Sequence, residues 1–401
     1  MSLLANRKSH YDVVVIGARC AGAATALLLA RKGMDVLVVD KSRLGSDTLS
    51  THALMRGGVL QLHRWGILEE VRKAGTPAVS TTTFHYGDES VEIAIKPREG
   101  IEALFAPRRT VLDPILAAAA ETSGAEILRG PRLIDLIRVP DGRVRGVVIE
   151  DPNGRRGEIS ADLVVGADGV RSKVADLVSA RLTHQGMHAT GVIYGYWEEL
   201  DLPGYHWYFK PGAGTGSIRT NGGTLVFAGV TREHFWQDVR FDLEAGFYQI
   251  LAEASPALAE SLPKSSRPDR LRGYAGHNGF LRECWGPGWA LVGDASYFKD
   301  PITAHGITDA LRDAELLARA IDISTPDSLN GYQELRNDLS LNLFRITDQV
   351  ASLDWSFEQL EALHREMSEE MKREVRFLAS LDNPVSGAAI SPRGGEMPKA
   401  S

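Results

Sequence analysis

The stretch from Tyr11 to Asp40 constrains the fold of this chain more than any other. It reads YDVVVIGARCAGAATALLLARKGMDVLVVD, which is the order strand, glycine-bounded turn, helix and second strand. Such a unit presents backbone N–H groups and the positive end of a helix dipole to a diphosphate. Asp40 ends the second strand, where a carboxylate can accept hydrogen bonds from both hydroxyls of a ribose. The stretch therefore predicts an adenine-dinucleotide site.

The turn departs from the usual pattern G-x-G-x-x-G at one position. It reads Gly17-Ala18-Arg19-Cys20-Ala21-Gly22, so Arg19 replaces the glycine that normally lets the backbone approach a pyrophosphate. An arginine there either adds a charge-assisted contact to phosphate or pushes the ligand away. Lys41 and Arg43 place further basic groups within reach of an adenosine or a diphosphate.

Length and charge narrow the class of protein. A chain of 401 residues predicts two or three domains, and a net charge of −7 argues against nucleic acid or an anionic membrane as a partner. Cys20 and Cys284 show neither a disulfide framework nor a metal spacing, so we expect a reducing cytoplasm and no metal. The first strand begins at Tyr11, which predicts no signal peptide, and the apolar segment 23–30 is too short for an integral membrane segment.

Strand patterns predict an α/β fold in which the chain twice leaves a Rossmann-like domain and returns. Buried apolar strands recur at 11–16, 161–169 and 289–292, whereas alternating or glycine-separated short strands fill the two excursions. The expected division is a discontinuous nucleotide-binding domain (1–75, 105–180 and 284–330), an inserted antiparallel-sheet substrate domain (76–104 and 181–283), C-terminal helices (331–385) and a flexible tail (386–401). Helices are expected at 59–65, from Arg109, at 171–178 and 241–260, from Gly306, and at 332–350 and 357–379.

Three glycine–acid sites each follow a buried strand: Gly17–Gly22, Gly166-Ala167-Asp168-Gly169 and Gly293-Asp294. In this order and at these distances they resemble the flavoprotein monooxygenases of the para-hydroxybenzoate hydroxylase type. That superfamily also contains geranylgeranyl reductases and flavin-dependent halogenases. The resemblance covers nearly all of residues 11–330. It implies FAD bound in an extended form, with NADPH or NADH as a transient electron donor.

At the adenine end, the resemblance implies that Gly17 and Gly22 contact the diphosphate and that Asp40 contacts the ribose. Arg109 matches the arginine or glutamine that reaches FAD from its helix. Leu133 falls where a backbone group contacts adenine.

Asp168 belongs to the motif that touches FAD and, transiently, the nicotinamide nucleotide. Asp294 matches the aspartate that hydrogen-bonds the ribityl chain. Pro301, Gly306 and Ile307 are implied to lie beside the isoalloxazine, where a helix N-terminus stabilises the negative charge of reduced flavin.

The loop before this last helix differs from the family pattern P-x-x-G-Q-G-x-N, because Ala304, His305 and Thr308 occupy three of its motif positions. His305 is either a proton carrier or a loop histidine bonded to backbone. His52, in a loop implied to lie near the flavin, is a second catalytic candidate, against a purely structural role.

No second dinucleotide fingerprint appears, since the glycines at 212–216 lack a preceding buried strand and a following helix. The leading hypothesis is a single-component NAD(P)H-dependent monooxygenase. Through a flavin C4a-hydroperoxide formed with molecular oxygen, it would hydroxylate an aromatic or polyketide-like small molecule. The substrate is expected beneath the sheet carrying Tyr196, Trp207 and Tyr208. Tyr208 is the catalytic candidate there, with His206 and Arg219 as further orienting groups.

Three alternatives remain open. A reductase of the geranylgeranyl type is the stronger runner-up, because the altered loop at 304–305 could disfavour oxygen chemistry. A halogenase should show W-x-W-x-I-P, which the stretch WEELDLP at 197–203 does not match. A flavin-binding sensor or carrier without turnover is the third.

Overall fold

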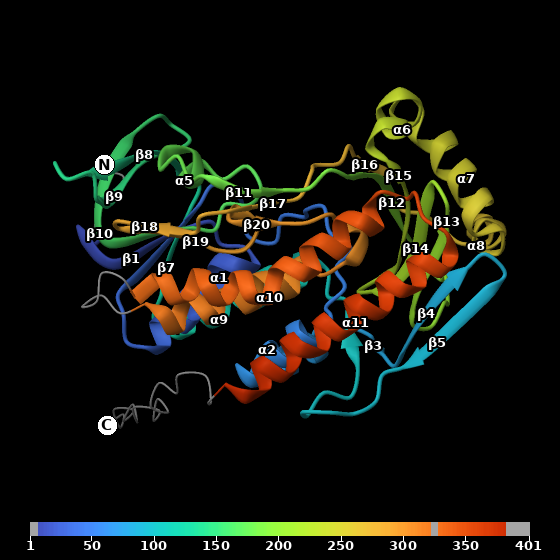
Figure 1. Cartoon of the computed structure of the whole chain (residues 1–401). Helices are drawn as coiled ribbons and strands as arrows, with labels where there is room; N and C mark the ends of the chain where they lie inside the picture. Colours follow the sequence, from blue (N-terminus) through green and yellow to red (C-terminus); the bar gives the residue numbers. More distant parts are fainter. Residues whose placement is uncertain (1–6, 322–327, 382–401) are drawn as a thin grey trace, which may run out of the picture.

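Two large sheets organise the molecule. The computed structural model describes residues 7–321 and 328–381. In Figure 1 the first sheet lies on the left, the second on the right, and the C-terminal helices α10 and α11 extend from one to the other. The arrangement confirms the predicted α/β class. The expected tail at 386–401 lies outside the described residues.

The main sheet is built around the first strand of the chain. Its order is β18-β19-β10-β1-β2-β7, with β9 pairing β10 and β8 pairing β9. The five strands from β19 to β7 are parallel, so their carboxyl ends meet at one edge, where α/β proteins bind ligands. The strands are β1 (His10–Ile16), β2 (Val36–Asp40), β7 (Glu126–Arg129), β8 (Arg132–Arg138), β9 (Val144–Glu150), β10 (Arg156–Gly166), β18 (Trp285–Gly286) and β19 (Trp289–Leu291).

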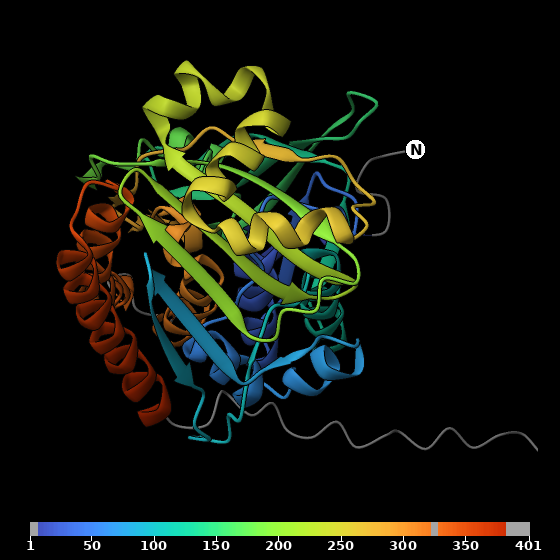
Figure 2. The ribbon, with the colours of Figure 1, turned by 90° about the vertical axis from the view of Figure 1, so that its right-hand side faces the viewer.

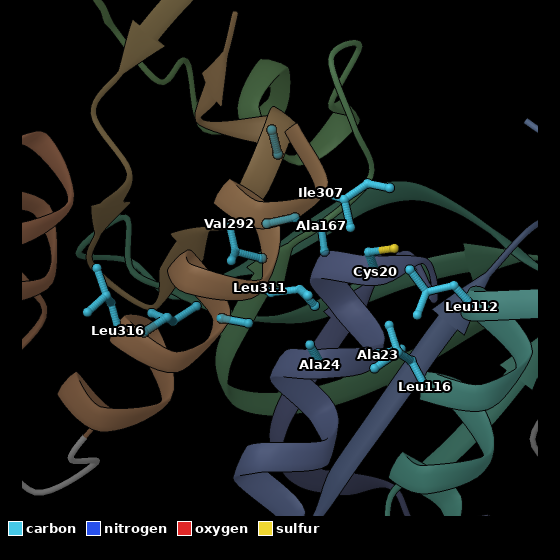
Figure 3. Close-up of a cluster of buried hydrophobic side chains, with 14 of the residues drawn as sticks. Cys20, Ala23, Ala24, Leu112, Leu116, Ala167, Val292, Ile307, Leu311 and Leu316 are labelled. Carbon is cyan, nitrogen blue, oxygen red and sulfur yellow. The ribbon is translucent and has the colours of Figure 1, made fainter. Parts of the chain in front are cut away.

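Three helices pack together beside the main sheet: α1 (Cys20–Arg31), α4 (Arg109–Thr122) and α9 (Gly306–Ala320). Figure 3 shows Leu112 and Leu116 of α4 beside Ala23 of α1, and Leu311 of α9 close to α1. The short alanine side chains of α1 let both neighbours approach closely. This packing fixes the amino ends of α1 and α9 with respect to the sheet.

The second sheet has the order β16-β12-β15-β14-β13-β4-β5 and is antiparallel except for the parallel pair β13–β4. It joins β4 (Thr81–Tyr86) and β5 (Glu89–Ala94) to β12 (Thr190–Trp197), β13 (Tyr205–Lys210), β14 (Ala213–Thr220), β15 (Gly223–Thr231) and β16 (Arg272–Tyr274). Figure 2 shows short helices lying across the outer face of this sheet. They are α6 (Arg232–Gln237), α7 (Leu243–Ala254) and α8 (Pro256–Ser261).

Two predicted helices differ from those observed. The segment 241–260 is not one helix, because Pro256 lacks the N–H for a continuous ladder and disfavours helical backbone at Ser255, so α7 ends and α8 begins there. The helix expected at 59–65 starts earlier, as α2 (Arg56–Arg64), across two glycines. A Cβ on Gly58 would lie 2.8 Å from the Thr308 Oγ1 atom, so close packing on α9 explains the glycine.

The C-terminal helices α10 (Ser328–Ala351) and α11 (Phe357–Ser380) pack on each other, and α11 also reaches α2. A capping box between Ser356 and Gln359 begins α11. The remaining elements are α3 (Leu68–Lys73), β3 (Ala78–Val79), β6 (Leu104–Phe105), α5 (Lys173–Leu177), β11 (Leu182–Gln185), η1 (Val239–Phe241), η2 (Leu262–Lys264), β17 (Phe280–Arg282), η3 (Gly293–Ala295), β20 (Tyr297–Phe298) and η4 (Pro301–Thr303). No helix within 7–321 and 328–381 has both the length and the apolar character needed to cross a bilayer.

Candidate active site

A cavity of about 920 Å³ opens at the carboxyl edge of the main sheet. Its lining runs along the ends of β2, β1, β10 and β19 and reaches the amino end of α9 and the second sheet. This volume is in the range of cofactor and small-molecule sites. Of the residues predicted from the sequence, those that line it are Gly17, Arg19, Asp40, Lys41, Arg109, Leu133, Asp168, Asp294, Pro301, Gly306 and Ile307.

The turn between β1 and α1 leaves room only for glycine at its two ends. Gly17 has φ +106°, and a Cβ there would lie 2.4 Å from the Ala167 carbonyl oxygen. A Cβ on Gly22 would lie 1.8 Å from the Gly17 carbonyl oxygen, so Gly22 brings the first helical turn against the loop without itself lining the cavity. Helix α1 has no side-chain cap at its amino end. Its first N–H groups and dipole are therefore directed at the cavity, as an anion site requires.

Arg19 takes the place of the middle glycine without blocking the turn. Its backbone is extended (φ −88°, ψ −168°), and its Nη1 atom donates a hydrogen bond to the Thr48 Oγ1 atom at 2.5 Å. Asp40 accepts backbone hydrogen bonds from Ala18 and Ser42, both at 2.5 Å, with one carboxylate oxygen each. Each oxygen keeps a second lone pair for a ligand hydroxyl. Arg43 does not line the cavity.

Arg109 and Asp294 bring opposite charges to the lining of the cavity. Arg109, the first residue of α4, binds Asp113 through two parallel hydrogen bonds of 2.8 and 3.1 Å. Cys20 donates a further hydrogen bond to Asp113 at 3.2 Å. Asp294 lies in η3, where burial raises the pKa of its carboxyl to about 6, although Arg109 and Lys299 act in the opposite direction.

Asp168 is held by the start of α5. Its carboxylate accepts from the Ser172 hydroxyl at 2.5 Å and from the Lys173 backbone N–H at 2.7 Å. Burial raises the pKa of this carboxyl despite these hydrogen bonds. Gly169 follows with φ +83° and also lines the cavity.

The loop before α9 turns sharply and then presents the helix to the cavity. Asp300 accepts from the Ile302 and Thr190 backbone N–H groups, and Ala304 takes a left-handed conformation with φ +49°. Helix α9 also lacks a side-chain cap, and Gly306 and Ile307 in its first turn line the cavity. Two helix amino ends, those of α1 and α9, thus open on one cavity.

His305 does not line the cavity and is fully buried. Its Nδ1 atom is 3.1 Å from an Asp309 carboxylate oxygen, and its Nε2 atom is 3.0 Å from one of Glu374. The side chain therefore pairs with two carboxylates. The interpretation of His305 as a loop histidine bonded to backbone does not describe these contacts. Burial lowers the pKa of His305, Lys299 and Arg312 act in the same direction, and Glu374 opposes the effect.

His52 lies behind the loop residues 48–51, which line the cavity, and does not line it itself. It is completely buried in a left-handed conformation (φ +65°), and its Nε2 atom is 2.5 Å from the Tyr196 hydroxyl. Burial lowers the pKa of His52 to about 3. The neutral imidazole anchors this loop to the second sheet through Tyr196.

Tyr208 faces away from the cavity. Side chains alternate along β13, so Trp207 and Phe209 pack toward the main core while His206 and Tyr208 face the other side. Tyr208 stacks on His85 with ring centroids 4.1 Å apart. Arg219 is also remote, paired with the exposed Asp201. Tyr208, His206 and Arg219 therefore do not line the cavity, because of a register on the sheet that was not evident from the sequence.

Other side chains of the second sheet form the cavity wall: Thr190, Val192, Tyr194, Gly214, Leu225, Phe227, Gly229 and Tyr274. Sequence reasoning missed these residues, although the alternation of Val192 and Tyr194 along one strand was a usable signal. It also missed Lys299, a lysine within a buried segment that lines the cavity beside Pro301.

Comparison with known proteins agrees with this geometry. Residues 10–324 match the family model described as "FAD binding domain". The chain belongs to this family. As a family member it is an FAD-dependent oxidoreductase, and the uncapped α1 amino end, the glycine-bounded turn and the Asp40 carboxylate fit the diphosphate and ribose of FAD.

Relatives and solved structures extend the comparison. The chain is 27% identical to menaquinone reductase of Mycolicibacterium smegmatis, over 77% of this chain and 75% of that protein. It is 25% identical to digeranylgeranylglycerophospholipid reductase 2 of Methanococcoides burtonii, over 82% and 80%. Among structures, it resembles PqsL of Pseudomonas aeruginosa, described as a probable FAD-dependent monooxygenase, with TM-score 0.75, 19% identity and coverage of 89% and 100%. The last similarity concerns the fold alone.

Proposed function

We propose that the protein is an FAD-dependent reductase that transfers electrons from reduced FAD to an unsaturated, apolar small molecule. In this proposal FAD lies along the carboxyl edge of the main sheet, with its adenosine at Asp40 and Leu133 and its ring beside Pro301, Gly306 and Ile307. An NAD(P)H donor reduces it. Asp294 accepts hydrogen bonds from the ribityl chain in this arrangement.

The observation that carries the proposal is the chemistry of the second-sheet wall. Among the described residues of that sheet, the side chains lining the cavity are aliphatic, aromatic, hydroxyl-bearing or absent, and none is a carboxylate, imidazole, amine or guanidinium. Deprotonating a phenol needs a base within hydrogen-bond reach. An apolar substrate has no acidic hydroxyl and needs no such base. Relatives named as reductases of menaquinone and of a geranylgeranyl lipid support the same substrate chemistry.

The chain's own residues would then bind, orient and exclude water. The amino ends of α1 and α9 hold the negatively charged parts of the cofactor, which supplies the two-electron chemistry when bound. Val192, Leu225 and Phe227 exclude water from the substrate region and orient an apolar chain by shape.

A monooxygenase acting on an aromatic ring is the second candidate. Tyr194 and Phe227 both line the cavity and lie on directly paired strands, so that an aromatic ring could pack between them. In that case molecular oxygen is the second substrate.

An anaerobic half-reaction separates the two. The FAD-loaded protein is reduced without excess reductant and mixed with menaquinone, a geranylgeranyl lipid or a panel of phenols. We expect a prenylated compound to restore the oxidised flavin spectrum without oxygen. Reoxidation only after oxygen is admitted, with hydroxylated product, would instead identify the monooxygenase.

A further inference from the structure

A buried network of ionisable side chains lies beneath the amino end of α9, next to the cavity. Its members come from the segment before α9, from α9 itself and from the distant helix α11: Lys299, His305, Asp309, Arg312, Asp313 and Glu374. None has more than 4% of its side chain exposed. Such a group is costly to bury unless its charges nearly balance.

The contacts show how each charge is paired. Asp309 accepts hydrogen bonds from Lys299 and, at 2.9 Å, from Arg312. Its carboxylate also lies 3.1 Å from the Nδ1 atom of His305. Glu374 accepts from Arg312 at 2.9 Å and lies 3.0 Å from the other nitrogen of His305. Arg312 also binds Asp313 at 2.7 Å. Two cations, Lys299 and Arg312, already bind these carboxylates, and we assign an ion-pair network and not a metal site.

The charge balance of the network indicates that one proton of the Lys299–His305 pair is weakly held. Three carboxylates face Arg312, Lys299 and His305, so the network is neutral only when both Lys299 and His305 are protonated. Their Nζ and Nδ1 atoms are 3.4 Å apart, and two positive charges at that distance repel each other strongly in a buried site.

Lys299 lines the cavity, so the proton that it shares with His305 lies next to the cavity. Burial lowers the pKa of Lys299 to about 7, with Arg312 acting in the same direction and Glu374, Asp313 and Asp294 opposing. The other groups facing its ammonium are Asp309, His305 and the Tyr297 ring, whose centroid is 4.9 Å away.

We propose that Lys299 and His305 share a proton site that takes up one proton from solvent when FAD bound in the cavity gains two electrons. The inference rests on the proposed placement of the flavin ring. Two electrons and one proton entering the cofactor add one negative charge beside Lys299. The proton gained by the pair neutralises that charge, so the total is two electrons and two protons. Glu374 is a positioning residue, which ties α11 to this pair.

The test is the midpoint potential of the FAD-loaded protein, measured across about one pH unit on either side of 7. One extra proton per two electrons changes the ratio of reduced to oxidised FAD tenfold per pH unit, or 29.6 mV. We expect the midpoint potential of the native protein to show this additional change with pH, which is the extra slope that the variants test. Lys299→Met should lose it, because His305 is then the only base of the pair and holds one proton in both oxidation states of FAD.

Glu315→Gln is the matched control, since Glu315 is a buried carboxylate on α9 that pairs with Arg319 and Trp65. It should keep the native slope. If Lys299→Met does not fold, His305→Gln makes the same test, because Lys299 is then the only base of the pair. A native protein without the extra slope, or FAD-loaded variants that retain it, would overturn the proposal. A protein that binds no FAD would instead contradict the proposed function.

Discussion

Asp294 shows how burial can prepare one side chain for a ligand. The positive charges of Arg109 and Lys299 favour its ionised form, yet burial still raises its pKa to about 6. A carboxylate that is poorly solvated gains strongly from new hydrogen-bond donors. We therefore expect this residue to contribute more to cofactor affinity than to the stability of the empty protein.

Asp294→Ala should lose FAD, because the ribityl hydroxyls would lose a charged acceptor. The loss should be about 2 kcal/mol or more, the usual strength of a charge-assisted hydrogen bond. Equilibrium titration with FAD measures it, and Asp294→Asn, which keeps shape and some hydrogen bonding, should fall in between. Native affinity in the alanine variant would remove Asp294 from the site.

His52 predicts a pH dependence of folding. Its folded pKa of about 3 lies below the unfolded value near 6.5, so the folded state excludes a proton that the unfolded chain binds. The contribution of neutral His52 to the free energy of unfolding is complete above pH 6.5. It is lost as the pH falls from 6.5 toward 3, by up to about 1.4 kcal/mol per pH unit. In His52→Gln, this part of the acid sensitivity should disappear from urea unfolding curves recorded over that range.

At the scale of elements, the turn from β1 into α1 is the part of the site most completely determined by local sequence. The two bounding glycines, the extended Arg19 and the carboxylate ending β2 follow one another within a single strand–helix–strand unit. That is why Gly17 and Asp40 could be placed at the cavity from the sequence. Lys299 and the second-sheet wall could not, because they depend on which strands pair and on where α11 packs.

Gly22→Ala should disrupt this turn. The added Cβ would meet the Gly17 carbonyl oxygen, and the necessary shift should cost about 3 kcal/mol together with most FAD binding. Gly331→Ala is the control, because Gly331 is an exposed glycine in α10 with open space around its Cα. It should stabilise the protein by about 0.5–1 kcal/mol. Thermal unfolding with and without FAD compares the two, and equal effects would contradict the packing argument.

At the scale of the whole molecule, the two sheets are joined by a small set of charges beside the cavity. Asp47 accepts from Arg108 at 3.1 Å and from Arg272 of β16 at 2.6 Å. These ion pairs hold the pKa of Asp47 below its usual value even though burial acts in the opposite direction. The guanidinium of Arg108 also stacks over Tyr196, 4.0 Å from the ring centroid.

Asp47→Asn should loosen the junction between the sheets. We expect a cost of about 1–3 kcal/mol, since two half-buried guanidinium groups would lose their acceptor, and faster hydrogen exchange in the loop 44–52. Asp201→Asn is the control, because Asp201 pairs with Arg219 while 82% exposed, and such pairs contribute little. Unchanged exchange in the Asp47 variant would show that the sheets are held by apolar packing alone.

The strand order also carries a consequence for biosynthesis. β1 and β2 are made early, but β19 and α9, which complete the cavity, follow the entire second sheet along the chain. A nascent polypeptide therefore lacks part of the cavity lining until Ile307 has emerged from the ribosome. In the proposed arrangement, FAD therefore meets a complete set of cavity walls only after about three quarters of the chain has been made.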